Sequence, residues 1–140
     1  MQPLSDIRLS GETFSLFNCL QVHAYPRDRQ GCVLIVEDEP SIAMDLETIV
    51  IELVTATVVV EGSIAATKEV LHEALDFAFL DVEVTDGKTL EIARILEHKH
   101  VPFVFVSGAP QDQLPFELRG VPFIPKPFHA AQIESAARCP

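Results

Sequence analysis

The chain has few cysteines, few basic residues and no long apolar run, and each shortage excludes a class of protein. Its three cysteines are Cys19, Cys32 and Cys139. Their number is odd and their spacing is unlike that of a zinc site, so we expect free thiols in a reducing compartment. No apolar run approaches the roughly 20 residues of a membrane-spanning helix, and the N-terminus lacks a signal-peptide pattern. We therefore expect a cytoplasmic protein with no membrane partner.

Basic residues are scarce relative to acidic ones. Lys plus Arg number 10 and Asp plus Glu number 21, which gives a formal net charge of −11. A protein that follows nucleic-acid phosphates needs a basic face, so we do not expect a nucleic-acid partner. The acidic balance suits a protein that holds a cation or meets a basic partner surface. A chain of 140 residues fits one domain with a core of its own.

Strand-like and helix-like segments alternate from residue 32 onward. Short runs rich in β-branched and aromatic residues predict strands, and apolar residues at helical spacing predict amphipathic helices. The expected strands are residues 32–37, 55–62, 76–81, 101–108 and 121–128. The expected helices are residues 40–54, 63–75, 86–100 and 129–138. Apolar strands that alternate with such helices predict an α/β fold with a parallel sheet covered on both faces.

Three of the expected helices have a clear apolar stripe. The stripe of the first consists of Ile42, Leu46, Ile49 and Leu53. That of the second consists of Ile64, Leu71 and Leu75, and Ser63 is a plausible N-cap. That of the third consists of Leu90, Ala93 and Leu96. These stripes predict which side chains face the sheet.

Two segments depart from the alternation. Residues 109–120, "APQDQLPFELRG", contain Pro115 where a helix interior would be, so we expect a loop or one or two turns. Residues 1–31 precede the pattern, and Phe14, Phe17 and Leu20 could form a short helical face there. This extension either packs on the domain or on a partner, or is a mobile tail. The sequence leaves both alternatives open.

Polar residues end four of the expected strands. Glu37 and Asp38 end the first, Asp81 ends the third, Ser107 the fourth and Lys126 the fifth. Singly, each has an ordinary explanation, since such acids cap helices, Ser-Gly forms turns and lysines are solvated. Ligands of parallel α/β sheets bind at the carboxyl ends of the strands, so all five are predicted to share one edge.

These five residues form a chemically coherent set. Carboxylates clustered at one edge repel one another unless a cation offsets their charge. Glu37, Asp38 and Asp81 are hard oxygen ligands suited to Mg²⁺. With the cation bound, a carboxylate oxygen of Asp81 can act as a nucleophile towards a phosphoryl group. The Ser107 hydroxyl and the Lys126 ammonium can then stabilise the phosphoryl oxygens.

The set resembles the receiver domain of two-component response regulators. The resemblance covers residues 32 to about 138 and depends on "VLIVEDEP", "FAFLD", "FVFVSG" and "PKPF" in that order. It implies a flavodoxin-like three-layer sandwich with a five-stranded parallel sheet of order 2-1-3-4-5 and a degraded fourth helix. We therefore expect an N-terminal extension of uncertain order at residues 1–31 and a receiver domain at residues 32–140.

The resemblance also implies roles for individual residues. Asp81 would accept a phosphoryl group with Mg²⁺, and the backbone carbonyl of Glu83 would be a further metal ligand. Ser107 would bind the phosphoryl oxygens, and Phe123 would be the aromatic switch residue that moves inward with it. The Lys126–Pro127 bond would be cis. The stretch after Asp81, "VEVTDGK", is shorter than the usual acceptor loop of this family and lacks its usual proline. Separately, the degraded fourth helix puts the usual signalling face of the family in doubt.

The resemblance implies a signalling protein and not an enzyme, with at most slow loss of its own phosphoryl group. A sensor histidine kinase or a histidine phosphotransfer protein would donate the phosphoryl group. The expected protein is a stand-alone receiver that acts on an unidentified downstream protein, or as a phosphate shuttle or sink. One alternative is a receiver-like binding module that is not phosphorylated. A haloacid-dehalogenase-type phosphatase is a weaker alternative, because its second acid would be Asp where this chain has Glu83.

Overall fold

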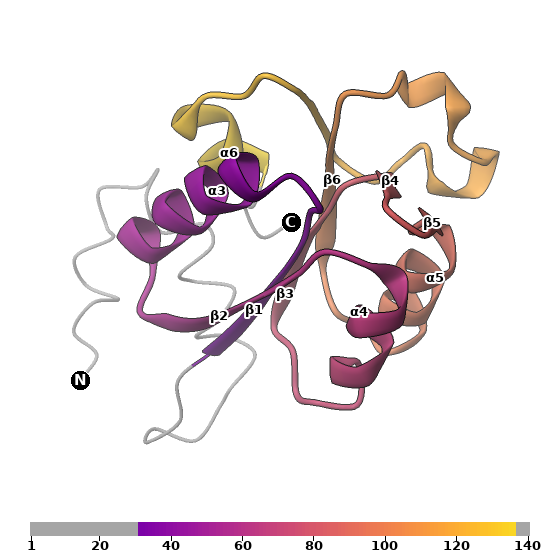
Figure 1. Cartoon of the computed structure of the whole chain (residues 1–140). Coiled ribbons are helices and arrows are strands. Elements are labelled where there is room, and N and C mark those ends of the chain that lie inside the picture. Colours follow the sequence, from indigo (N-terminus) through magenta and orange to yellow (C-terminus); the bar gives the residue numbers. More distant parts are fainter. Residues whose placement is uncertain (1–30, 137–140) are drawn as a thin grey trace.

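Five short apolar segments pair in parallel to form one sheet (Figure 1). The computed structural model describes residues 31–136. In spatial order the strands are β2 (Ala56–Glu61), β1 (Gly31–Val36), β3 (Phe77–Leu80), β6 (Phe103–Ser107) and β7 (Phe123–Pro125). Numbered along the chain among themselves, these five strands have the order 2-1-3-4-5. The expected flavodoxin-like sheet is therefore confirmed.

Helices cover both faces of this sheet. Helices α3 (Pro40–Leu53) and α6 (Ala130–Ala136) lie on one face, and α4 (Ile64–Val70) and α5 (Leu90–His98) lie on the other (Figure 1). Successive side chains of a strand point to opposite faces. In β1, Val33 and Ile35 accordingly join the core under α3 and α6, while Leu34 and Val36 join the core under α4 and α5. Strand β1, second in the sheet order, is thus buried on both sides.

The first helix packs on the sheet through a stripe slightly different from the expected one. Its buried residues are Ala43, Leu46 and Val50. Leu46 was expected there, but Ile42, Ile49 and Leu53 are only half-buried. The expected stripe did not include Ala43, which is buried together with Leu46 and Val50. The contact is therefore centred one residue further along the helix.

The second and third helices are shorter than expected. Helix α4 ends at Val70, although Leu71 and Leu75 beyond it are buried as expected. Its N-cap is Ser63, whose hydroxyl accepts a hydrogen bond from the Ala66 amide at 3.1 Å. Helix α5 begins at Leu90 and not near residue 86, because the preceding residues form a small antiparallel hairpin. Its strands are β4 (Glu83–Val84) and β5 (Gly87–Lys88).

The segment between β6 and β7 contains no α-helix. It forms two 3₁₀ turns, η2 (Gln111–Gln113) and η3 (Phe116–Leu118), as Pro115 predicted. Leu114 and Leu118 are almost completely buried and join the core on the α5 side of the sheet. The Arg119 guanidinium donates hydrogen bonds to the carbonyls of Leu114 (2.9 Å) and Asp112 (3.1 Å). Two leucines and one arginine thus help to hold a segment whose own backbone hydrogen bonds are those of short 3₁₀ turns.

The predicted extension at residues 1–31, with its Phe14, Phe17 and Leu20 face, lies outside the described residues apart from Gly31. The same holds for Cys19 and Cys139. In the part of the chain that the structure describes, no helix is long and apolar enough to cross a membrane.

The leucines of the segment between β6 and β7 should contribute strongly to stability. We expect Leu118→Ala to lower the free energy of unfolding by about 2–5 kcal/mol, because it leaves a cavity in a closed core. Phe116 is 85% exposed, so Phe116→Ala in the same turn should change it by less than about 0.5 kcal/mol. Urea titration measures both. A small effect of Leu118→Ala would show that the segment is not part of the core.

Candidate functional site

Backbone pairing brings two acidic side chains to the same edge of the sheet. The Glu37 amide donates to the Glu61 carbonyl at 2.9 Å, and the Asp81 amide donates to the Val36 carbonyl at 2.9 Å. The ladder therefore continues one residue past the ends of β1 and β3. Glu37 and Asp81 are consequently held at the carboxyl edge of neighbouring strands, as the sequence predicts.

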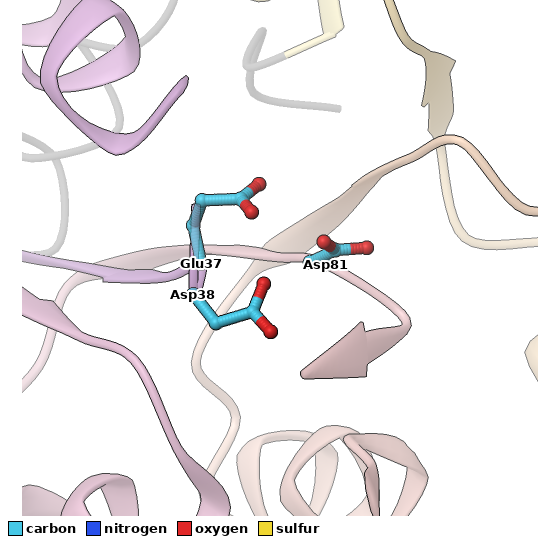
Figure 2. Close-up of side chains that lie close together, drawn as sticks. All are labelled: Glu37, Asp38 and Asp81. Atoms are coloured by element: carbon cyan, nitrogen blue, oxygen red, sulfur yellow. The ribbon is translucent and has the colours of Figure 1, made fainter. Parts of the chain in front are cut away.

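Three carboxylates converge at this edge. One oxygen from each of Glu37, Asp38 and Asp81 lies within 4.8 Å of the other two, and Figure 2 shows the three side chains gathered together. Glu37 and Asp81 are only 4% and 8% exposed, whereas Asp38 is exposed to solvent. Such a set of oxygen donors, closed towards the core and open towards solvent, fits a Mg²⁺ ion that keeps several waters.

Lys126 joins two of these carboxylates. Its Nζ lies 2.6 Å from Glu37 Oε1 and 2.9 Å from Asp81 Oδ2. The lysine follows β7, and its backbone amide donates to the Ser107 carbonyl at 3.0 Å. The next peptide bond, Lys126–Pro127, is cis, as the resemblance implied. Residues after three different strands therefore meet in one ion-paired group.

Glu37 and Lys126 are buried enough that their pKa values depart from the ordinary ones. Burial raises the pKa of Glu37, and the negative charge of Asp81 raises it further, while the hydrogen bonds from Lys126 and the Glu39 amide offset part of the effect. Burial alone lowers the pKa of Lys126, but its hydrogen bonds and attraction to Asp81 and Glu37 outweigh burial and raise that pKa. Lys126 thus stays charged beside Glu37 and Asp81, and with Asp38 nearby three carboxyl groups share one ammonium.

Two further residues of the predicted set lie along the neighbouring strands. Ser107, at the end of β6, is 2% exposed, and its hydroxyl accepts a hydrogen bond from the Ala109 amide at 3.1 Å. No hydrogen bond joins it to Asp81 within residues 31–136. Phe123 in β7 is half-buried, with its ring centroid 6.4 Å from that of Phe105.

The loop after Asp81 contains residues that the sequence analysis did not single out. The Thr85 hydroxyl donates to Asp38 Oδ2 at 3.2 Å, and the buried Thr89 hydroxyl donates to the Asp81 carbonyl at 2.6 Å. The Asp86-Gly87 dipeptide is a turn signal that could have predicted the hairpin. The side chain of Glu83 faces Lys88 at 3.6 Å, and its carboxylate is not part of the three-carboxylate group.

Comparisons with known proteins agree with this arrangement. No protein-family model matches the chain. The chain is 35% identical over 106 residues to the sensory transduction protein LytT of Enterococcus faecalis, a match that covers 72% of this chain and 44% of LytT. The chain spans less than half the length of the curated relatives it matches.

Solved structures share both the fold and part of the sequence. SdrG of Sphingomonas melonis Fr1 matches with a TM-score of 0.66 and 35% identity, over 76% of this chain and 92% of SdrG. The non-phosphorylated receiver domain of HemR from Leptospira biflexa matches with a TM-score of 0.65 and 25% identity, over 79% of this chain and 97% of that domain.

The sheet order and the acidic edge define a doubly wound α/β domain of the receiver class. The chain belongs to the response-regulator receiver domains of two-component signalling. Such domains act as phosphoryl acceptors and interact with histidine kinases or phosphotransfer proteins, so phospho-accepting signalling is the class of function that this fold supports.

Glu37 should make the stability of the metal-free protein depend on pH. Because its folded-state pKa lies above that of the unfolded chain, the folded state binds the proton more tightly. The resulting stabilisation is complete below the unfolded pKa and is lost as pH rises through the raised folded pKa. We expect urea titrations in EDTA to show this loss in the wild type and a flatter profile in Glu37→Gln. Identical profiles would contradict the raised pKa.

Proposed function

We propose that the chain is a phospho-accepting receiver in which Asp81 receives the phosphoryl group. The convergence of Glu37, Asp38 and Asp81 on one point, with Lys126 paired to two of them, supports this proposal. An acceptor needs a nucleophilic oxygen together with cationic groups that offset the charge of the incoming phosphoryl group. The candidate site offers both at the solvent-facing edge of the sheet.

Glu37, Asp38 and Asp81 would hold Mg²⁺, with the backbone carbonyl of Glu83 as a further ligand. When bound, the metal would neutralise the charge that builds up on the phosphoryl oxygens during transfer. A carboxylate oxygen of Asp81 forms the new P–O bond while the P–N bond of a phosphohistidine breaks. The electron pair of that bond leaves with the imidazole nitrogen of the donor.

Lys126 and Ser107 then stabilise the phosphorylated form. Lys126 already contacts Asp81 at 2.9 Å and can turn its ammonium to a phosphoryl oxygen. The Ser107 hydroxyl uses a lone pair to accept the Ala109 amide, so its own hydrogen remains available to donate. A movement of Ser107 towards the phosphoryl group would leave room for Phe123, the proposed switch residue, to turn inward.

The donor that suits this chemistry is a sensor histidine kinase or a histidine phosphotransfer protein. The receiver, proposed to span residues 32–140 after an N-terminal extension, would pass its signal to a downstream protein by contact or act as a phosphate shuttle or sink. A receiver-like module that binds partners without phosphorylation is the second candidate. The phosphatase alternative finds little support, because the Glu83 carboxylate pairs with Lys88 and stays out of the acidic group.

Intact mass after incubation with acetyl phosphate tests the proposal. We expect one added phosphoryl group that requires both Mg²⁺ and Asp81, so that it is present in wild type and absent in Asp81→Asn. Asp112→Asn is the matched control, because Asp112 is exposed and lies in η2, outside the site. Absence of an adduct in wild type, with beryllofluoride also failing to bind, would favour the non-phosphorylated binding module.

Ser107 should affect phosphoryl transfer without affecting the metal. We expect Ser107→Ala to slow the initial rate of phosphorylation by roughly tenfold or more, because a donor to the phosphoryl oxygens is lost. Ser107→Thr keeps the hydroxyl and should stay near the wild-type rate. Mg²⁺ affinity should be the same in all three proteins. A wild-type rate in Ser107→Ala would remove Ser107 from the mechanism.

A further inference from the structure

The hairpin of β4 and β5 connects two parts of the molecule that lie far apart in the sequence. Its turn consists of Thr85 and Asp86, and Gly87 follows with a φ of 140°, a conformation that favours glycine. At its base, Thr89 ties the chain back through its hydroxyl to the Asp81 carbonyl and through its amide to the Val82 carbonyl. The turn is therefore fixed relative to the proposed acceptor residue.

Asp86 fixes the tip of the hairpin to helix α4. Its two carboxylate oxygens accept hydrogen bonds from the backbone amides of Ile64 (2.7 Å) and Ala65 (3.1 Å). These amides belong to the first turn of the helix, where backbone N–H groups lack partners within the helix itself. The two bonds lower the pKa of Asp86, so its carboxylate remains charged and continues to accept both. The turn consequently cannot drift away from α4 without breaking them.

Thr85 lies next to this anchor and points its hydroxyl at the acidic group. The Thr85 hydroxyl donates to Asp38 Oδ2 at 3.2 Å. No other hydrogen bond or ion pair reaches the Asp38 carboxylate within residues 31–136. Asp38 is exposed, and the neighbouring Glu37 and Asp81 carry the same charge, so repulsion and hydration both favour turning its carboxylate out to solvent. The Thr85 hydroxyl opposes that rotation.

We propose that Thr85 is a positioning residue for metal binding, which orients the Asp38 carboxylate towards Glu37 and Asp81 and is itself held in place by Asp86. This inference depends on the proposed function, because it concerns the same candidate Mg²⁺ site. Partners that orient metal ligands commonly change metal affinity when they are removed. Here the hairpin after the acceptor would set the affinity of the metal site from outside the ligand set.

Mg²⁺ titration by calorimetry on the full chain tests the role of Thr85. We expect Thr85→Val, which keeps the shape and loses the donor, to bind Mg²⁺ roughly threefold to tenfold more weakly. Thr85→Ser should restore affinity to near that of wild type. Thr48→Val is the matched control, because the exposed Thr48 hydroxyl donates to the Met44 carbonyl on α3, away from the site. Thermal unfolding without metal checks that all variants are folded.

The remaining outcomes separate this inference from the proposed function. Wild-type affinity in Thr85→Val, or equal weakening in Thr85→Ser, would overturn the role of the hydroxyl and leave the proposed function intact. Equal weakening of Mg²⁺ binding in Thr48→Val would also overturn the role of the Thr85 hydroxyl, because the effect would then not depend on a contact at the site. If wild type itself bound no Mg²⁺, the proposed function and this inference would fail together.

A double-mutant cycle tests whether Asp86 acts through Thr85. Asp86→Ala should weaken Mg²⁺ binding in the wild-type background. It should have little further effect in the Thr85→Val background, because both changes free the Asp38 carboxylate to rotate. Equal weakening in both backgrounds would show that Asp86 affects the metal site by another route and would overturn that part of the inference.

Discussion

The pairing of β1 with β3 is the constraint on which the site depends. It places Glu37 and Asp81, which carry like charges, beside each other at an edge where both are almost completely buried. Like charges held together in a partly buried place are unfavourable unless a cation is near. Lys126 supplies one positive charge from the end of β7, yet three carboxylates remain against a single ammonium. The repulsion among these carboxylates is therefore only partly offset, and a bound divalent cation would reduce it further.

The structure shows how two shortened parts of the domain are supported. The loop after Asp81 is short, but Thr89 closes its base and Asp86 fixes its tip to α4. The segment before β7 lacks an α-helix, but Leu114 and Leu118 fill the core beneath it. In both places side-chain contacts support short elements, a two-stranded hairpin and two 3₁₀ turns. A degraded helix in sequence thus does not mean a loose segment in the fold.

These supports separate the parts of the domain that are held closely from those that remain available to move. Asp81 and Glu37 are held by the strand ladder and by Lys126. Phe123 lies half-buried on an edge strand, and the Ser107 hydroxyl accepts a hydrogen bond from the Ala109 amide of its local turn. Within residues 31–136 the side chains of these two proposed switch residues therefore have no ion pair like the one between Asp81 and Lys126. This difference suits a domain in which the proposed acceptor stays in place while the proposed switch side chains move.

The sequence alone determined the sheet, its strand order and the edge on which the polar residues meet. Apolar runs and helical stripes have fixed periods, and the strand order and cis Lys126–Pro127 bond followed from a resemblance based on four ordered motifs. The tertiary structure decided the rest. In the structure the buried stripe of α3 includes Ala43, and α4 ends at Val70. The residues expected to begin the third helix form part of a hairpin instead. The tertiary structure also brought Thr85 to Asp38 and Asp86 to α4, because such contacts depend on distances between segments that no local pattern encodes.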